Sequence, residues 1–124
     1  MPPSDPDIAP PALQIVTQAA LPAALADSPF GPFVLQPCAG RDAVLARLAA
    51  GGCDALVLDD GADAIDLLAE AERDVAILVV AASPDPAAVL AWLARGAQDV
   101  LRIDELCAAS LPQRLRAAIE RKRL

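Results

Sequence analysis

Two strand-sized apolar runs constrain the fold of this chain most strongly. They are "DALVLD" at residues 54–59 and "VAILVVAA" at residues 75–82. The second has no polar residue and reads as a strand buried on both faces, as in a parallel sheet. Neither run approaches the roughly 18 apolar residues that a membrane-spanning helix needs. The two runs therefore predict the inner strands of a covered sheet, with no membrane segment.

Strand and helix patterns alternate along the rest of the chain. Further strands are predicted at 13–18, 32–37 and 98–103. Helices are predicted at 20–28, 40–52, 62–73, from an N-cap at Ser83 to a stop at Gly96, and at 109–123. Five such strand–helix units predict an α/β fold with a doubly wound, five-stranded parallel sheet. We expect one domain over residues 12–124, preceded by a disordered, proline-rich tail over residues 1–11.

Composition excludes several classes of function. The net charge of −7 argues against nucleic acid as the main partner. The chain has no histidine, the commonest general base and metal ligand. Its three cysteines show no CxxC spacing, so neither a disulfide framework nor a zinc site is expected. No signal peptide is recognisable, and the cytoplasm is the expected compartment.

In a doubly wound sheet, chemistry is placed at the carboxyl ends of the strands. No glycine-rich turn follows the first strand, so a dinucleotide site is not expected. The candidate positions that remain are Thr17 and Gln18, Asp59 and Asp60, Ala81 to Ser83, and Ile103 and Asp104.

Three segments resemble the receiver domains of bacterial response regulators. "DALVLD" resembles the strand that ends in the phosphoacceptor aspartate, here Asp59. "AAVLAWLARGAQDVLRIDEL", residues 87–106, resembles the fourth helix and fifth strand, and "LPQRLRAAIERKRL", residues 111–124, the final helix. The resemblance implies a flavodoxin-like or CheY-like fold with strand order 2-1-3-4-5. It also points to receivers that stand before sensor or cyclic-di-GMP-handling domains, so we expect the chain to be excised from a longer protein.

The sequence departs from the receiver pattern at most of the site. The acidic Mg²⁺ ligands are replaced by Thr17 and Gln18, the hydroxyl ending strand four by Ala81, and the lysine ending strand five by Ile103. Val100 stands where the receiver pattern has an aromatic residue in strand five. Arg102 precedes the lysine position by one residue, so its side chain should point to the opposite face of the sheet. Asp59 and Asp60 could still bind Mg²⁺ weakly. We therefore expect a degenerate, non-catalytic receiver without a cofactor, in which Asp59 is vestigial.

The surfaces remain as candidates for function. Residues 87–94, "AAVLAWLA", contain no polar side chain, which favours burial against a partner or a second copy. Receivers commonly dimerise through helix four, strand five and helix five, which makes interface candidates of Val89, Trp92, Leu93, Arg95, Asp99 and Arg114. For Trp92 the alternative is a place in the core, filling space left by the small residues near Ala81, and this interpretation is favoured.

Three hypotheses follow for the function. The first is a dimerisation or protein-docking module of a cytoplasmic signalling protein. The second is an active receiver that accepts phosphate on Asp59. The third is a regulatory module that binds a small molecule in the vacated pocket around Thr17, Ala81 and Ile103.

Overall fold

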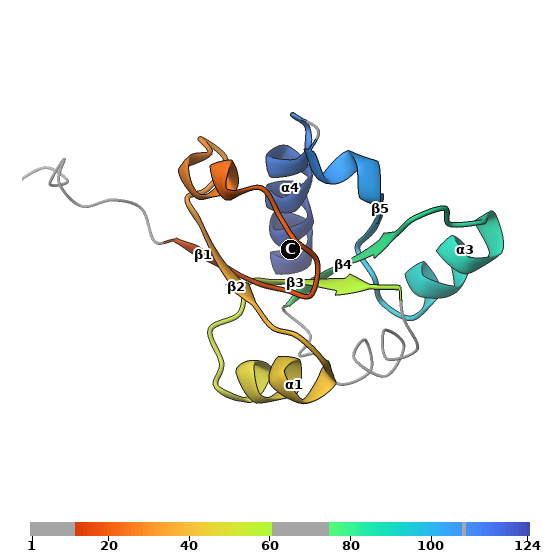
Figure 1. The fold of residues 1–124 in the computed structure, drawn as a ribbon, viewed down its shortest axis with the longest axis horizontal. Coiled ribbons are helices and arrows are strands. Elements are labelled where there is room, and N and C mark those ends of the chain that lie inside the picture. The colour runs from red at the N-terminus through yellow and green to blue at the C-terminus, as the bar shows by residue number, and fades with distance from the viewer. Residues whose placement is uncertain (1–11, 61–74, 108) are drawn as a thin grey trace, which may run out of the picture.

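The computed structural model of the protein describes residues 12–60, 75–107 and 109–124 (Figure 1). Five parallel strands form one sheet in the order β2-β1-β3-β4-β5. The strands are β1 (Leu13–Thr17), β2 (Phe33–Pro37), β3 (Ala55–Asp59), β4 (Ala76–Ala81) and β5 (Asp99–Arg102). The α/β class and the strand order predicted from the sequence are confirmed.

Three α-helices and two 3₁₀ helices connect these strands in the described residues. They are α1 (Arg41–Ala49), α3 (Pro86–Ala94), α4 (Leu111–Arg123), η1 (Ala23–Asp27) and η2 (Ile103–Cys107). The helix predicted at 20–28 is only the short η1, since Pro22 precedes it and Ser28 is already extended. The helix predicted at 62–73 and the tail at 1–11 lie outside the described residues.

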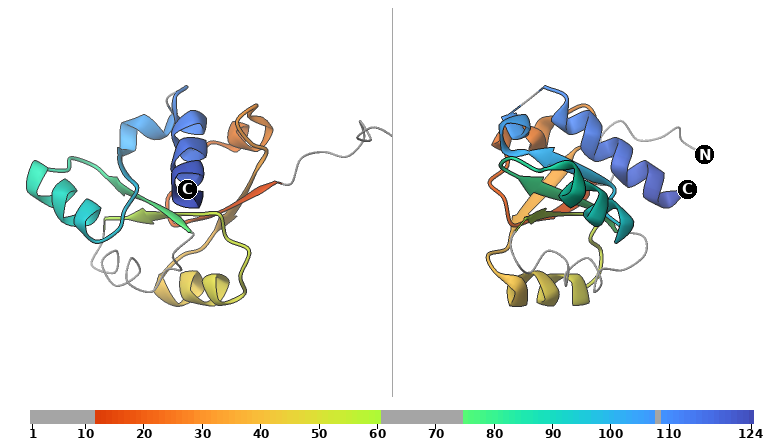
Figure 2. Two further views of the ribbon diagram at one scale, coloured as in Figure 1. Left: turned by 180° about the vertical axis from the view of Figure 1, so that it is seen from behind. Right: turned by 90° about the vertical axis from the view of Figure 1, so that its right-hand side faces the viewer.

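The helices lie on opposite faces of the sheet. Figures 1 and 2 show α1 below the sheet and α4 above it, whereas α3 lies at the end of the molecule beside β5. The side of α4 buries Leu78, Leu101 and Leu115 in one apolar cluster. The side of α1 buries Val44 and Leu56 in a second cluster. Each sheet face thus has its own core.

Strand alternation explains how one sequence fills both cores. Neighbouring residues of β3 point to opposite faces, so Leu56 and Leu58 enter the α1 cluster and Val57 enters the α4 cluster. All six residues of β4 are buried, as its continuous apolar run predicts. This strand lies between β3 and β5 and is covered on both faces.

The N-cap of α3 differs from the prediction. Asp85, not Ser83, precedes the helix, and its carboxylate accepts a hydrogen bond from the N–H of Ala88 at 2.8 Å. Aspartate with proline at the next position is a strong helix start. The predicted stop is confirmed, because Gly96 has a φ of +111° just after the helix ends.

Candidate functional site

Asp59, the phosphoacceptor-like residue, ends β3 with an exposed side chain. Its backbone N–H donates to Oε1 of Gln18 at 3.1 Å. The N–H of Gln18 in turn donates to the carbonyl of Val57 at 2.9 Å. A neutral amide from the end of β1 therefore ties two strand ends together where the receiver pattern has a carboxylate.

The side chain of Thr17 is engaged in a local turn. Its side chain is only 2% exposed, and its hydroxyl donates to the carbonyl of Ala19 at 2.7 Å. The same oxygen accepts from the N–H of Ala19 at 3.1 Å. The hydroxyl is thus used within the loop after β1 rather than offered to a ligand.

A shallow hollow of about 250 Å³ lies beside Asp59. Its lining is mostly apolar: Gln18, Ala19, Ala20, Asp59, Val80, Ile103 and Leu106. The side chain of Ile103 is 55% exposed at the start of η2, one residue beyond the end of β5. Among the described residues of this lining, only Asp59 carries a charge.

The three positions of the hypothetical vacated pocket do not share one hollow. Thr17 lines a separate hollow of about 390 Å³ with Leu35 and Pro37. Ala81 is buried at the end of β4 and lines neither space. Of the three, only Ile103 lines the hollow beside Asp59, whereas Ala81 follows Val80, the β4 residue that pairs with Asp59.

The cation at the end of β5 is engaged in an ion pair. Arg102 pairs with Asp104 at 3.0 Å, with both side chains well exposed. Asp60 is exposed beside Asp59, and its backbone N–H bonds to the carbonyl of Val80. Within the described ranges, no three Asp, Glu or Cys side chains gather closely enough to hold a metal ion.

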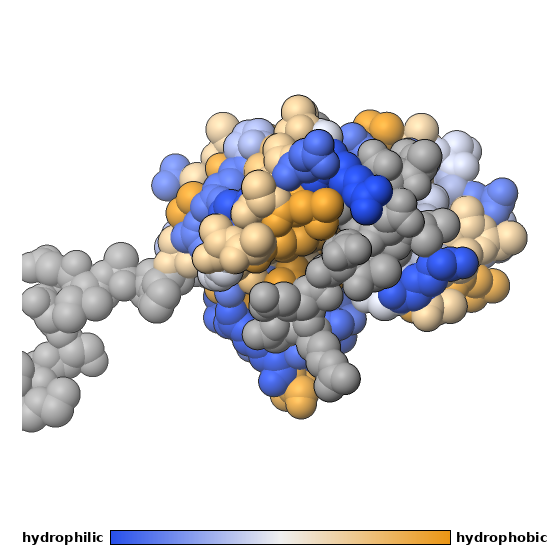
Figure 3. Space-filling view, turned by 90° about the horizontal axis from the view of Figure 1, so that it is seen from below, coloured by the Kyte–Doolittle hydropathy of each residue, from blue (hydrophilic) through white to orange (hydrophobic). Residues whose placement is uncertain are grey.

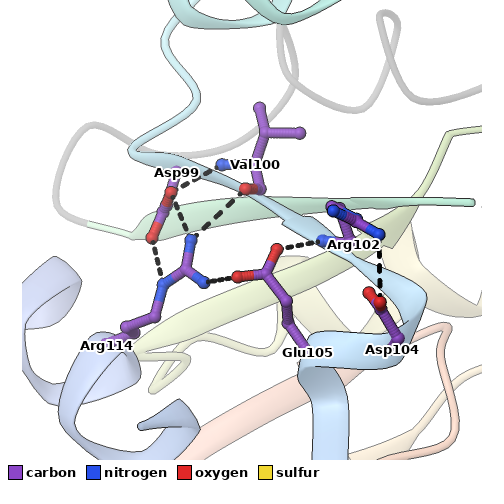
Figure 4. Close-up of polar contacts among 6 residues, drawn as sticks. All are labelled: Asp99, Val100, Arg102, Asp104, Glu105 and Arg114. Carbon is purple, nitrogen blue, oxygen red and sulfur yellow. Dashed lines mark hydrogen bonds and ion pairs between the residues drawn. The ribbon is translucent and has the colours of Figure 1, made fainter. Parts of the chain in front are cut away.

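A second polar cluster joins β5, η2 and α4 (Figure 4). The guanidinium of Arg114 binds both carboxylate oxygens of Asp99 at 3.0 Å and pairs with Glu105. Asp99 and Glu105 raise the pKa of Arg114 above its ordinary value, with the hydrogen bonds to Asp99 as the largest cause. Two predicted interface residues, Asp99 and Arg114, are therefore each other's partners within one chain.

Glu105 was missed by the sequence reasoning, although its spacing from Arg102 carries a signal. Its carboxylate accepts from the backbone N–H of Arg102 at 2.8 Å, three residues back. This is the reach of a capping side chain at a helical turn. That hydrogen bond, and then Arg114, lower the pKa of Glu105 below 4.5.

Replacing Glu105 with Gln should make the free energy of unfolding less dependent on pH below about pH 4.5. A carboxylate with a lowered folded pKa stabilises the fold above its unfolded pKa, and this stabilisation is lost as the pH falls through the folded pKa. At pH 7 we expect a loss of about 0.5–1 kcal/mol, since the pair is partly solvated. Urea unfolding between pH 3 and pH 7 measures it. Glu120→Gln, in an exposed pair with Arg116, is the control; an equal pH effect there would contradict the assignment.

The remaining interface candidates lie on or beside α3. Val89 and Trp92 are half-buried, and Trp92 packs against the α1-side core cluster. Leu93 and Arg95 are exposed. The aromatic ring thus serves the core, and the outward positions of α3 are left open to solvent.

Solved structures that superpose on this chain include NtrX, the signal receiver domain of NarL and a pilus assembly-related protein. NtrX from Brucella abortus, solved in complex with ADP, superposes with a TM-score of 0.69 at 17% identity, over 90% of this chain and 27% of its own. The signal receiver domain of NarL from Mycobacterium tuberculosis gives 0.60 at 20% identity, over 90% and 96%. A pilus assembly-related protein from Burkholderia pseudomallei gives 0.59 at 20%, over 90% and 89%.

These likenesses define the class of fold. The chain has the CheY-like fold of response-regulator receiver domains. It spans about a quarter of the NtrX chain. No family model and no curated protein sequence matches it. None of its described helices is long and apolar enough to cross a membrane.

Proposed function

We propose that this protein is a degenerate receiver module that does not accept a phosphoryl group and serves as a dimerisation or docking unit in a cytoplasmic bacterial signalling protein. The observation that carries the proposal is the hydrogen bond between Gln18 and the backbone of Asp59. It places a neutral amide where a receiver's metal ligand would stand. The chain's part is then to bind rather than to catalyse.

The charge around Asp59 supports this reading. Phosphoryl transfer to a carboxylate brings several negative oxygens together, and catalysis depends on cations that neutralise them. Here the described residues that line the adjacent hollow are apolar apart from Gln18 and Asp59. Ile103 is the residue at the position of the lysine that ends strand five in the receiver pattern, and Arg102 is paired with Asp104. Among the residues that the structure describes, no cation lines the hollow beside the carboxylate of Asp59, where it could stabilise a transition state.

The likeness to NtrX supports a place inside a longer protein. The superposed region is 27% of that chain, so the same fold occurs there as one part of a larger protein. By the resemblance of its last helix, this module stands before sensor or cyclic-di-GMP-handling domains. It works as a homodimer or as a dock for other domains of its parent.

Mass spectrometry after incubation with Mg²⁺ and acetyl phosphate tests the proposal. The wild-type protein should gain no phosphoryl group, whereas an active receiver treated in parallel should. The Asp59→Asn variant should likewise gain no phosphoryl group. A mass gain in the wild type that Asp59→Asn abolishes would establish the active receiver instead.

One observation favours the small-molecule hypothesis as a second candidate. The hollow of about 250 Å³ beside Asp59 combines apolar walls with one carboxylate. Such a space suits a small cation with an apolar chain, because the apolar walls cover the chain and the carboxylate of Asp59 binds the charged group. Butylammonium should then raise the melting temperature of the wild type but not of Asp59→Asn.

A further inference from the structure

An apolar hollow of about 200 Å³ lies between η1, η2 and the first turn of α4. Figures 1 and 2 show these three elements on one side of the sheet. The hollow differs from the outer side of α3, where Leu90 is 66% exposed and hydrophobic residues gather on an open surface (Figure 3). Because three elements form its walls, the hollow limits the size and the chemistry of what can occupy it.

Three buried leucines form the floor of this hollow. They are Leu25 of η1, Leu106 of η2 and Leu111 of α4. The same three side chains belong to the apolar cluster on the α4 side of the sheet. The packing of the core therefore holds the floor in place, so that the hollow is formed before a ligand arrives.

The rim of the hollow consists of small and rigid residues. Ala24 and Ala109 are exposed, and Pro22 and Pro112 are half-buried. Pro22 stands directly before η1 and Pro112 lies in the first turn of α4, and the proline ring fixes the backbone φ at both positions. Alanine leaves the mouth open, and neither residue type brings a polar side-chain atom.

The described lining offers no hydrogen bond from a side chain, because it consists of leucine, alanine and proline. The backbone of η1 is also engaged: the carbonyl of Pro22 accepts from the N–H of Leu25, and the carbonyl of Leu25 from the N–H of Ser28. Water in such a space finds few partners, and an apolar group gains affinity by displacing it. The chemistry of the walls therefore favours an apolar occupant.

The charges on the same three elements disfavour an anionic occupant. In the first turn of α4, the guanidinium of Arg114 is already bound by Asp99 and Glu105. The last residue of η1 is Asp27, and η2 carries Asp104 as well as Glu105. An anionic group at the mouth would meet carboxylates without a free cation among the described residues of these elements. A neutral molecule meets no such penalty.

The volume of the hollow sets the size of its occupant. An apolar protein cavity of about 150 Å³ lined by Leu, Ile and Phe can hold benzene. The volume of about 200 Å³ here leaves room for one substituted ring. We propose that this hollow binds a small neutral aromatic molecule of about the size of toluene. The inference goes beyond the docking role proposed above, because it assigns the chain a ligand.

Leu106 connects this binding site to the site around Asp59. Its side chain lines the apolar hollow and also the hollow beside Asp59. A ligand that packs against Leu106 therefore changes the surroundings of both hollows without touching the carboxylate. By this contact, a receiver fold that accepts no phosphoryl group can still respond to a small molecule.

An amide NMR titration of the whole chain with toluene measures the binding. We expect shifts centred on Leu25, Leu106 and Leu111, with a dissociation constant on the order of 1 mM. Benzoate has the same ring with an anionic group and should cause no such shifts at equal concentration. A spectrum that toluene leaves unchanged, shifts centred elsewhere, or equal binding of benzoate would overturn the proposal.

The variant Ala24→Phe tests where the ligand binds. Its ring can fill the hollow from within the chain, so the affinity for toluene should fall at least tenfold. Ala26→Phe changes another exposed alanine of η1, outside the lining, and should bind toluene as the wild type does. Should Ala24→Phe not fold, Ala109→Phe at the exposed rim before α4 takes its place. Equal affinity in the blocked variant and the control would overturn the placement.

Asp59→Asn separates this inference from the proposed function. The carboxylate of Asp59 does not line the apolar hollow, so this variant should bind toluene with unchanged affinity. Loss of toluene binding in Asp59→Asn would place the ligand in the other hollow and overturn the assignment. The phosphoryl assay judges the proposed function by itself, because its outcome does not depend on toluene.

Discussion

The variant Gln18→Asp/Ala81→Ser/Ile103→Lys is expected to bind Mg²⁺ and then beryllofluoride, neither of which the wild type should bind. The three changes restore, respectively, a metal ligand, a hydroxyl and a cation of the receiver pattern. We expect a dissociation constant for Mg²⁺ of about 1 mM, against no measurable binding before. Isothermal titration calorimetry measures both ligands.

The structure explains why these positions should suffice. Gln18 already lies against the backbone of Asp59, so a carboxylate there adds an oxygen ligand beside that of Asp59. Ile103 shares a hollow with Asp59 and is half-exposed, so a lysine can reach the carboxylate without burying its charge. Thr17 is left unchanged because it is 2% exposed and holds the turn at Ala19. A carboxylate there would be buried without a partner.

The control is the same variant with Asp59→Asn added. It should lose the binding of beryllofluoride, because the site then lacks the carboxylate that forms the adduct. The restored variant could fold and still bind neither ligand. The failure of the wild type to bind them would then have a cause other than the residues at positions 18, 81 and 103. That result would contradict our account of the site.

Leu115→Ala should lower the free energy of unfolding by about 3 kcal/mol, whereas Leu90→Ala should change it by less than about 0.5 kcal/mol. Both residues are leucines on helices that flank the sheet. Leu115 of α4 is fully buried in the core cluster with Leu78 and Leu101, so its truncation leaves a cavity. Leu90 of α3 is 66% exposed, so its truncation removes little buried surface.

Urea unfolding at low protein concentration, where the chain is monomeric, measures both variants. The contrast matters because it separates the two helices by role: α4 stabilises the fold, and the outer side of α3 is available for binding. A loss of 2 kcal/mol or more in Leu90→Ala would contradict this division, since it would place Leu90 in the core of the single chain.

The fold could be predicted from the sequence because its strongest signals are local. The run over residues 75–82 and the alternation of strand and helix specify a parallel sheet before any tertiary contact is known. Gly96 marked the end of α3 for the same reason, because few other residues adopt a φ of +111°. The N-cap was misassigned because Ser83, Asp85 and the prolines between and after them offer competing starts.

The site was less predictable because it depends on contacts between distant segments. The sequence predicted which residues stand at the strand ends, but not that Gln18 bonds to the backbone of Asp59, 41 positions away. Nor did it indicate that Arg114 binds Asp99 and Glu105 within the chain. Such pairings arise from the crossing of β5, η2 and α4, which no local pattern encodes (Figure 4).

An amide NMR titration of the protein with Mg²⁺ and then beryllofluoride tests the central claim most directly. Our account predicts a folded spectrum that does not change with millimolar Mg²⁺ or beryllofluoride, because Gln18 and Ile103 stand near Asp59 at positions where the receiver pattern has a metal ligand and a lysine. Shifts centred on Asp59 and spreading to α3 would contradict it. They would show that the receiver chemistry survives in this chain.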